Sequence, residues 1–135
     1  MVIEHVIAIY VADLKRSKAF YQDLLELVVT FDSDWCVQMS SVQHPALKLT
    51  LQPRNHELIP EAYRHTPQGF SIAFVVDDVD RLYQRARSMN LRIIKAPTNE
   101  MYGQRRFLTL DPDGGLVDVS SPCEPSPEFI ARYMS

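Results

Sequence analysis

The sequence predicts an α+β fold built from two βαβββ modules, and three observations predict it. Residues 6–27 and 71–91 align at a constant offset of 65 residues, which places Asp13 on Asp78. Each copy begins with a strand-like run and continues with the apolar spacing of a helix. Three further segments rich in β-forming residues follow each helix. The repeated order indicates two modules of one architecture.

The leading strand of each module has one apolar face, because side chains alternate along a strand. We expect this face to pack under the module's helix, and we expect the alternate residues to point the other way. Asp13 and Asp78 stand where a helix N-cap belongs. The predicted helix-side residues are Ile7, Ile9 and Val11 with Ile72, Phe74 and Val76, and the opposite residues are Ala8, Tyr10, Ala73 and Val75.

The two helices and the later strands follow from residue spacing. Leu14, Ser17, Phe20, Tyr21, Leu24 and Leu25 follow helical spacing, as do Val79, Leu82, Tyr83, Ala86 and Met89. Strand-like segments cover residues 27–31, 35–41 and 46–53 in the first module and 91–97, 104–110 and 115–121 in the second. The run Asp-Pro-Asp-Gly-Gly at 111–115 predicts a turn.

The chain of 135 residues has the length of a single domain, residues 1–135. Within it the expected parts are a first module over about 2–53, a linker over about 54–68, a second module over about 69–121 and a tail over 122–135. The linker and the tail are both interrupted by prolines.

Composition excludes several classes of protein. A net charge of −3 without a clustered basic excess argues against nucleic-acid binding. The two cysteines, Cys36 and Cys123, have no CxxC partner, so neither a disulfide framework nor a zinc–thiolate site is expected. No secretory leader and no run of membrane-spanning length is present. We therefore expect a cytoplasmic protein without membrane contacts.

Three stretches resemble the vicinal-oxygen-chelate superfamily of glyoxalases, bleomycin resistance proteins and dioxygenases. They are IYVADLKRSKAFYQDLLEL in the first module, IAFVVDDVD at the start of the second, and YGQRRFLTLDPDGGLVDV near its end. The resemblance covers residues 2–121. It implies a glyoxalase/bleomycin-resistance fold, in which the sheets curl around a shared cup. It also implies a homodimer and, in the enzymes, a divalent metal held by one side chain from the first and last strand of each module.

The positions that carry metal ligands in the family hold other residues here. The first-strand position, seven residues before each motif aspartate, is Val6 in one module and Ser71 in the other. The last-strand position is Asp118 in the second module and Leu49 in the first, with Thr50 as the alternative register. One carboxylate and a hydroxyl do not meet the needs of a catalytic metal.

His5 is the remaining candidate metal ligand. It lies one residue too early, and a one-residue shift moves a side chain to the opposite face of a strand. We therefore predict no metal and no cofactor. The alternative is a β-bulge that turns His5 into the cup, where it would bind a divalent metal with Asp118.

The predicted cup is mostly apolar, as small-molecule pockets usually are. Tyr10 and Trp35 could stack on a planar ligand, although Trp35 could equally be a core or dimer-interface residue. Arg105 and Arg106 alternate, so one should face the cup and either bind an anionic ligand or pair with Asp118, which is also the only candidate base. The predicted ligand-binding residues are Val6, Tyr10, Trp35, Gln38, Leu49, Ser71, Arg106 and Asp118, with Ala8, Ala73 and Val75 also lining the cup.

Three functional hypotheses follow. The preferred one is a metal-independent protein that encloses a small hydrophobic or aromatic molecule, similar to the drug-sequestering resistance proteins. The second is a metal-dependent glyoxalase-like lyase, isomerase or dioxygenase with non-standard ligands. The third is a degenerate member of the superfamily, with a filled cup, that serves in protein interaction.

Overall fold

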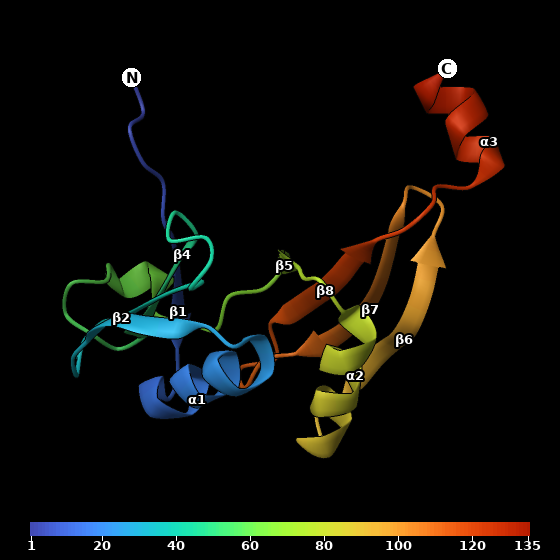
Figure 1. The fold of residues 1–135 in the computed structure, drawn as a ribbon. Helices are drawn as coiled ribbons and strands as arrows, with labels where there is room; N and C mark the ends of the chain where they lie inside the picture. Colours follow the sequence, from blue (N-terminus) through green and yellow to red (C-terminus); the bar gives the residue numbers. More distant parts are fainter. The chain divides into compact units, whose positions relative to one another are not determined.

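Each half of the chain folds as a βαβββ unit, as the sequence predicts (Figure 1). The structure, a computed structural model, describes residues 1–135 and divides them into units over residues 1–69 and 70–135. Each unit holds one four-stranded mixed sheet, and neither sheet is closed into a barrel.

The first unit begins with β1 (Ile7–Val11), which leads into α1 (Leu14–Leu25). Three strands follow as an antiparallel run: β2 (Val28–Asp32), β3 (Val37–Ser40) and β4 (Lys48–Pro53). The strand order is β1-β4-β3-β2, with β1 parallel to β4. The segment from α1 to β3 forms the crossover connection that this parallel pairing requires.

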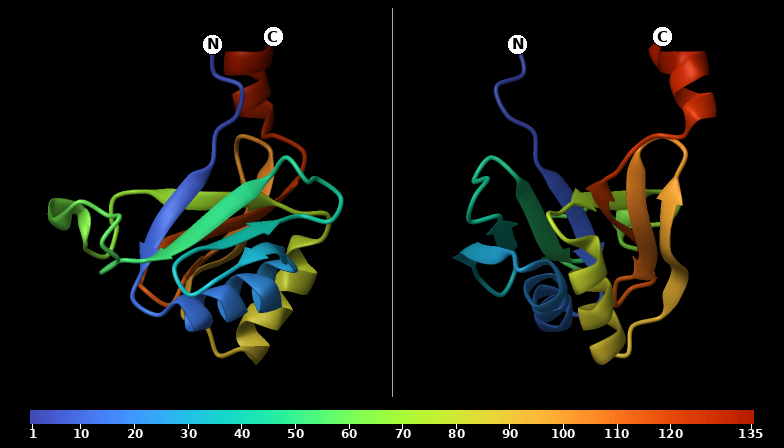
Figure 2. Two further views of the ribbon diagram at one scale, coloured as in Figure 1. Left: turned by 90° about the vertical axis from the view of Figure 1, so that its left-hand side faces the viewer. Right: turned by 45° about the vertical axis from the view of Figure 1, so that its right-hand side comes forward.

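The second unit repeats this topology. It contains β5 (Ser71–Val75), α2 (Val79–Ser88), β6 (Ile93–Glu100), β7 (Gln104–Leu110) and β8 (Leu116–Pro122). The strand order is β5-β8-β7-β6, and β5 runs parallel to β8. The right-hand view of Figure 2 shows α2 lying along the sheet of its own unit.

Both helices begin at the predicted aspartates. The Asp13 carboxylate accepts a hydrogen bond from the backbone N–H of Arg16, and Asp78 accepts one from Arg81, each over 3.1 Å. These bonds satisfy N–H groups that the first turn of a helix leaves without partners. The apolar stripe of each helix is buried, through Ser17, Phe20, Tyr21, Leu24 and Leu25 in α1 and Val79, Leu82 and Ala86 in α2.

One face of each sheet forms the core of its unit. The predicted helix-side residues are buried, apart from Ile7 at the exposed start of β1 and half-buried Val76. The ladder extends this face across the first sheet, because Leu49 and Leu51 pair with both β1 and β3. The other buried residues on these two core faces are Val37 and Met39 in the first sheet and Phe107, Val117 and Val119 in the second.

The expected linker is folded against the first unit. It contains a short 3₁₀ helix, Glu61–Tyr63, and buries Ile59. Arg64 donates from Nε to the Ile59 carbonyl over 2.8 Å, and Arg54 donates to the Thr66 hydroxyl over 2.9 Å. The segment after β4 therefore has its own hydrogen-bonded structure.

The tail is attached to the turn between β6 and β7. Cys123 donates its N–H to the Gly103 carbonyl over 2.8 Å, and Ser126 donates to Met101 over 2.9 Å. Ser126 then caps α3 (Pro127–Phe129), which continues as a π-helical turn over Ile130–Met134. The tail therefore ends in a short helical segment. No helix of the chain has both the length and the apolar character needed to cross a membrane.

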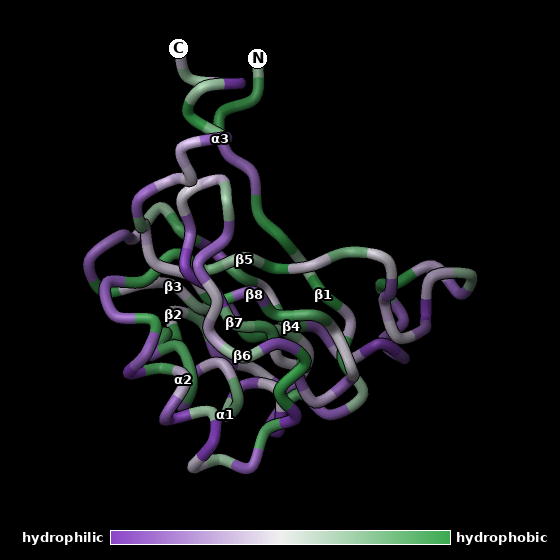
Figure 3. The backbone as a smooth tube through the Cα atoms, turned by 90° about the vertical axis from the view of Figure 1, so that its right-hand side faces the viewer, coloured by the Kyte–Doolittle hydropathy of each residue, from purple (hydrophilic) through white to green (hydrophobic).

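The chain ahead of β1 is exposed. Figure 3 shows that it starts hydrophobic and then turns hydrophilic before the first strand. Glu4 in this segment forms an ion pair with Lys48 at the start of β4. The contact ties the N-terminal segment to the neighbouring strand.

Candidate ligand-binding faces of the two sheets

Each sheet has a second face, opposite its helix, which we call the open face. In the first unit Ala8, Thr50, Gln38 and Phe31 form one row across the four strands, as the ladder pairs them in turn. Tyr10 alternates with the helix-side residues of β1 and so lies on this side as well. Val6 immediately precedes β1. Val6 and Phe31 are exposed and Tyr10 is half-buried.

Leu49, predicted to face the cup, does not belong to the open face. It pairs with Ile7 and Met39, which places its side chain on the helix side, where it is 2% exposed. Thr50, the alternative register, pairs with Ala8 and Gln38 on the open face. The error has a simple cause: a shift of one residue exchanges the two faces of a strand.

Trp35 lies in an aromatic cluster with Phe31 and His56. Its ring centroid is 6.2 Å from Phe31 in an edge-on arrangement and 6.1 Å from the His56 ring. The turn that carries it is held by Ser33, whose hydroxyl bonds the Cys36 carbonyl over 2.8 Å. Trp35 nevertheless stays 38% exposed, so its ring offers free surface in this unit. The cluster partners Phe31 and His56 were not predicted.

Asp118 lies on the open face of the second unit. It pairs with Ala73 on β5 and with Leu108 on β7, and Leu116 and Ser120 flank it along β8. Ser71 and Val75 share this side through the alternation of β5. Val75 is 65% exposed, and Ser71 and Ala73 are also exposed.

Arg106 forms the polar centre of this open face. Its Nε donates to Glu100 Oε2 over 2.6 Å and its Nη1 donates to Asp118 Oδ2 over 3.1 Å. The sequence left two roles open for this arginine, namely binding an anionic ligand or pairing with Asp118. In the structure it pairs with Asp118. Arg105 points to the other face and pairs with Asp80 of α2, with Nη2 and Oδ1 3.0 Å apart.

Glu100 receives two cations. Lys95 Nζ donates to both carboxylate oxygens, at 3.1 and 3.0 Å, and Arg106 supplies the third hydrogen bond. The hydrogen bonds from Lys95 and Arg106 lower the pKa of Glu100. In return, the bond to Glu100, with a smaller contribution from Asp118, raises the pKa of Arg106. Lys95, Glu100, Arg106 and Asp118 are called the charge network below.

Lys95 and Glu100 were not among the predicted site residues. The strand predicted over 91–97 is longer in the structure and reaches Glu100. Glu100 pairs with Gln104 across a tight turn in which Gly103 has a φ of +100°. The signal was present in the sequence, since a glycine between two β-forming runs predicts a hairpin, and hairpin pairing brings Glu100 near Arg106.

One oxygen in the charge network has no partner. Asp118 Oδ1 is buried and accepts no hydrogen bond, although the side chain as a whole is 16% exposed. A buried carboxylate oxygen without a donor is unfavourable, because it has lost water and gained nothing in exchange. Asp118 thus accepts fewer hydrogen bonds than Glu100, the other carboxylate bonded to Arg106.

The residues at the family's ligand positions do not fit a divalent metal. His5 precedes β1 and is exposed, and β1 pairs with β4 in unbroken register from Ile7 onward. The side chains at the four positions are those of Val6, Thr50, Ser71 and Asp118, and the one carboxylate among them is already bonded to a guanidinium. Zinc, manganese and iron need several imidazole, carboxylate or thiolate donors.

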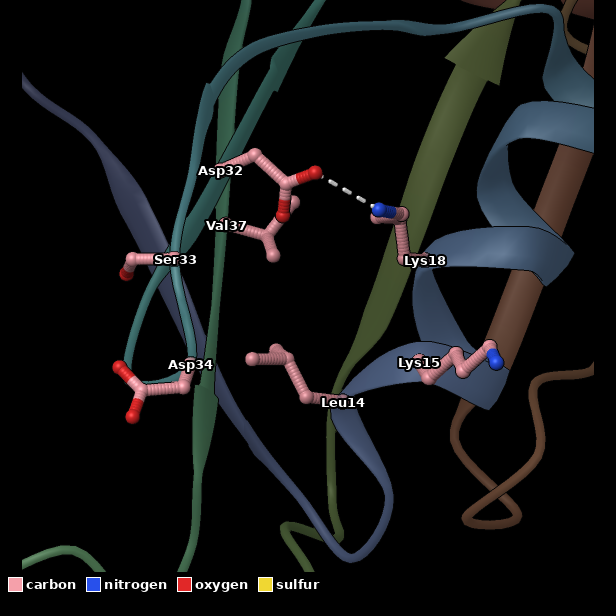
Figure 4. Close-up of a pocket in the computed structure, with 7 residues that line it drawn as sticks. All are labelled: Leu14, Lys15, Lys18, Asp32, Ser33, Asp34 and Val37. Atoms are coloured by element: carbon pink, nitrogen blue, oxygen red, sulfur yellow. Dashed lines mark hydrogen bonds and ion pairs between the residues drawn. The ribbon is translucent and has the colours of Figure 1, made fainter.

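A pocket of about 220 Å³ opens elsewhere in the first unit, between the start of α1 and the turn after β2 (Figure 4). Lys18 points across it to Asp32, and the two form an ion pair of 2.8 Å. The Asp34 carboxylate points away from Lys18 in this view. Leu14 and Val37 supply its apolar wall. None of the predicted ligand-binding residues lines this pocket.

The cysteines offer no activated nucleophile. Both are half-buried free thiols. Burial raises the pKa of Cys36, so this thiol is less ionised at neutral pH than an exposed one.

This architecture defines the chain as a paired βαβββ protein. A model of the Glyoxalase/Bleomycin resistance protein/Dioxygenase superfamily matches residues 3–119. The chain therefore belongs to this superfamily, which confirms the resemblance seen in its motifs. No curated protein sequence matches it.

Several solved structures share this fold. A glyoxalase/bleomycin resistance protein/dioxygenase family enzyme from Burkholderia phytofirmans has a TM-score of 0.74 and 22% identity, over 87% of this chain and 96% of that one. A lactoylglutathione lyase from Agrobacterium tumefaciens has a TM-score of 0.69 and 23% identity, over 89% and 92%. A virulence protein from Salmonella typhimurium has a TM-score of 0.72 and 20% identity, over 90% and 99%.

Proposed function

We propose that the protein binds a small hydrophobic or aromatic molecule on the open faces of its sheets, in the cup that the family resemblance implies. In this proposal no resident metal takes part. We further propose that the protein acts as a homodimer in the cytoplasm. The ligand-binding residues are the predicted set, with Thr50 in place of Leu49.

The observation that carries the proposal is the exposure of apolar side chains on the faces opposite the helices. In the first unit Phe31 is exposed, as are Trp35 in the following turn and Val6 just ahead of β1, and in the second Val75 is exposed beside Ala73. Exposed apolar surface rimmed by a few polar groups is typical of a ligand-binding surface. Half-buried Gln38 and the charge network supply such polar groups.

The charge network supports metal-independent binding. A divalent cation at Asp118 would stand beside the guanidinium of Arg106, which already donates to Asp118 and to Glu100. It would find one carboxylate there, whereas zinc, manganese or iron needs several imidazole, carboxylate or thiolate donors. Both carboxylates of this face already accept hydrogen bonds from side chains of the protein itself.

A thermal-shift screen against aromatic compounds and glutathione adducts, in the presence of a chelator, tests the proposal. We expect at least one compound to raise the melting temperature, because a ligand bound only by the folded state stabilises it. The single tryptophan, Trp35, gives an independent fluorescence readout of binding on the first unit.

Face-blocking substitutions locate the binding surface. Ala8→Arg and Ala73→Arg each place a long charged side chain on an exposed position of one open face. Ala131→Arg makes the same change at an exposed position of the C-terminal helix and serves as the matched control. We expect one or both of the first two variants to lose binding and the control to keep it.

Other results would contradict the proposal. Loss of binding in Lys18→Ala alone would place the ligand in the pocket beside α1. Stoichiometric metal in protein purified without added metal, lost in His5→Ala and Asp118→Ala, would favour the metal-dependent lyase, isomerase or dioxygenase. Uniformly flat responses would favour the protein-interaction hypothesis.

A further inference from the structure

The charge network distributes its cations unequally between its two carboxylates. Glu100 accepts hydrogen bonds from Lys95 and from Arg106, and its contact with Arg106 is 2.6 Å. Asp118 accepts from Arg106 alone, over 3.1 Å, and its Oδ1 is left without a donor. Arg106 is therefore bound mainly to Glu100, and Asp118 retains unused capacity to accept hydrogen bonds.

The surroundings of Asp118 are apolar on the side away from Arg106. Its cross-strand neighbours on the open face are Ala73 and Leu108, and Leu116 precedes it by two residues along β8. A carboxylate between small and aliphatic side chains favours a ligand that combines an apolar body with a hydrogen-bond donor. A ligand carboxylate would meet Asp118 as a like charge.

We propose that the molecule bound on the open face of the second unit is a lipophilic amine, whose protonated nitrogen donates to Asp118 while its apolar body covers Ala73 and Leu108. This inference rests on the function proposed above and specifies the ligand class. Oδ1 has no contact with solvent, so the amine reaches Asp118 by turning its carboxylate or by displacing Arg106 Nη1. Arg106 keeps its shorter bond to Glu100 in either case.

Calorimetric titration with three probes that share one ring system tests the proposal: 1-naphthylmethylamine, 1-naphthylmethanol and 1-naphthoate. We expect wild type to bind the amine roughly tenfold or more tightly than the carboxylate, the difference that a charge-assisted hydrogen bond gives. The preference should disappear in Asp118→Asn. It should persist in Asp80→Asn, which removes another arginine-paired aspartate from the opposite side of the unit.

Glu100→Gln provides a second variant that keeps Asp118. Removing the Glu100 charge leaves Arg106 free to bind Asp118 more closely, so the preference for the amine should fall. Equal binding of all three probes, or tighter binding of the carboxylate, would overturn the inference and leave the proposed function standing. Absence of binding by all three probes would count against the amine site and against an aromatic ligand together.

Discussion

Arg106 and Asp118 form an ion pair on the open face of the second sheet, with Nη1 and Oδ2 3.1 Å apart. Asp118 stands at the position that the family resemblance assigns to a metal ligand. The pairing gives this carboxylate a partner from its own unit. The arginine comes from β7, the strand next to β8, so the sheet itself holds the two side chains together.

A double-mutant cycle over Arg106→Gln and Asp118→Asn measures this contact. The two side chains are 25% and 16% exposed, so the pair is largely shielded from water. We expect a coupling free energy of about 1 kcal/mol from urea unfolding. The cycle over Arg105→Gln and Asp80→Asn is the control, because this pair is more exposed and should couple by less than about 0.5 kcal/mol. Equal coupling free energies in both cycles would contradict the prediction that the shielded pair of Arg106 and Asp118 is the stronger one.

The stability of the protein should fall in acid partly through Glu100. Its pKa is lowered in the folded state below the ordinary value of 4.5, so the unfolded chain takes up this proton first as the pH falls. The stabilisation is complete above about pH 4.5 and is lost as the pH drops through the folded pKa. Urea midpoints at pH 7 and below pH 4 should therefore differ more for wild type than for Glu100→Gln. An equal loss of stability in acid in both proteins would show that Glu100 does not contribute to the pH dependence of stability.

The order of the elements could be predicted from the sequence because each rests on a local signal. Asp13 and Asp78 mark helix starts through their capping carboxylates, and alternation in β1 and β5 identifies the buried faces. Partners across strands were harder to predict. The register of β4 decides between Leu49 and Thr50, and the alternation of leucines at 47, 49 and 51 with Lys48 and Thr50 already favours a buried Leu49. The charge network depends on hairpin pairing between β6 and β7, which strand propensity alone does not specify.

The register of β4 has a direct consequence for stability. Leu49→Ala should lower the free energy of unfolding by about 2–4 kcal/mol, because Leu49 is buried in the core of the first unit. Thr50→Val exchanges a hydroxyl for a methyl group of similar size without leaving a cavity, so it should change stability by less than about 1 kcal/mol. Denaturant unfolding compares the two variants. A larger loss in Thr50→Val would place the strand in the opposite register.

The attachment of the tail depends on Gly103. This residue has a φ of +100°, and a Cβ there would lie 3.0 Å from Pro125 Cγ and 3.2 Å from the Cys123 carbonyl oxygen. We expect Gly103→Ala to cost about 1–2 kcal/mol and to make the tail more sensitive to proteolysis. Gly114→Ala is the control, since Gly114 also has a positive φ of +83° but open space around its Cβ position. Equal proteolysis in both variants would argue against the tail contact.

Calorimetric titration of the tightest aromatic ligand from the thermal-shift screen tests metal-free binding most directly. One sample of the protein is stripped with chelator, and portions of it are reloaded with Mn²⁺, Ni²⁺ or Zn²⁺. If the open faces bind the ligand by themselves, the dissociation constant is the same in all portions. Binding that occurs only after a metal is restored would contradict this account.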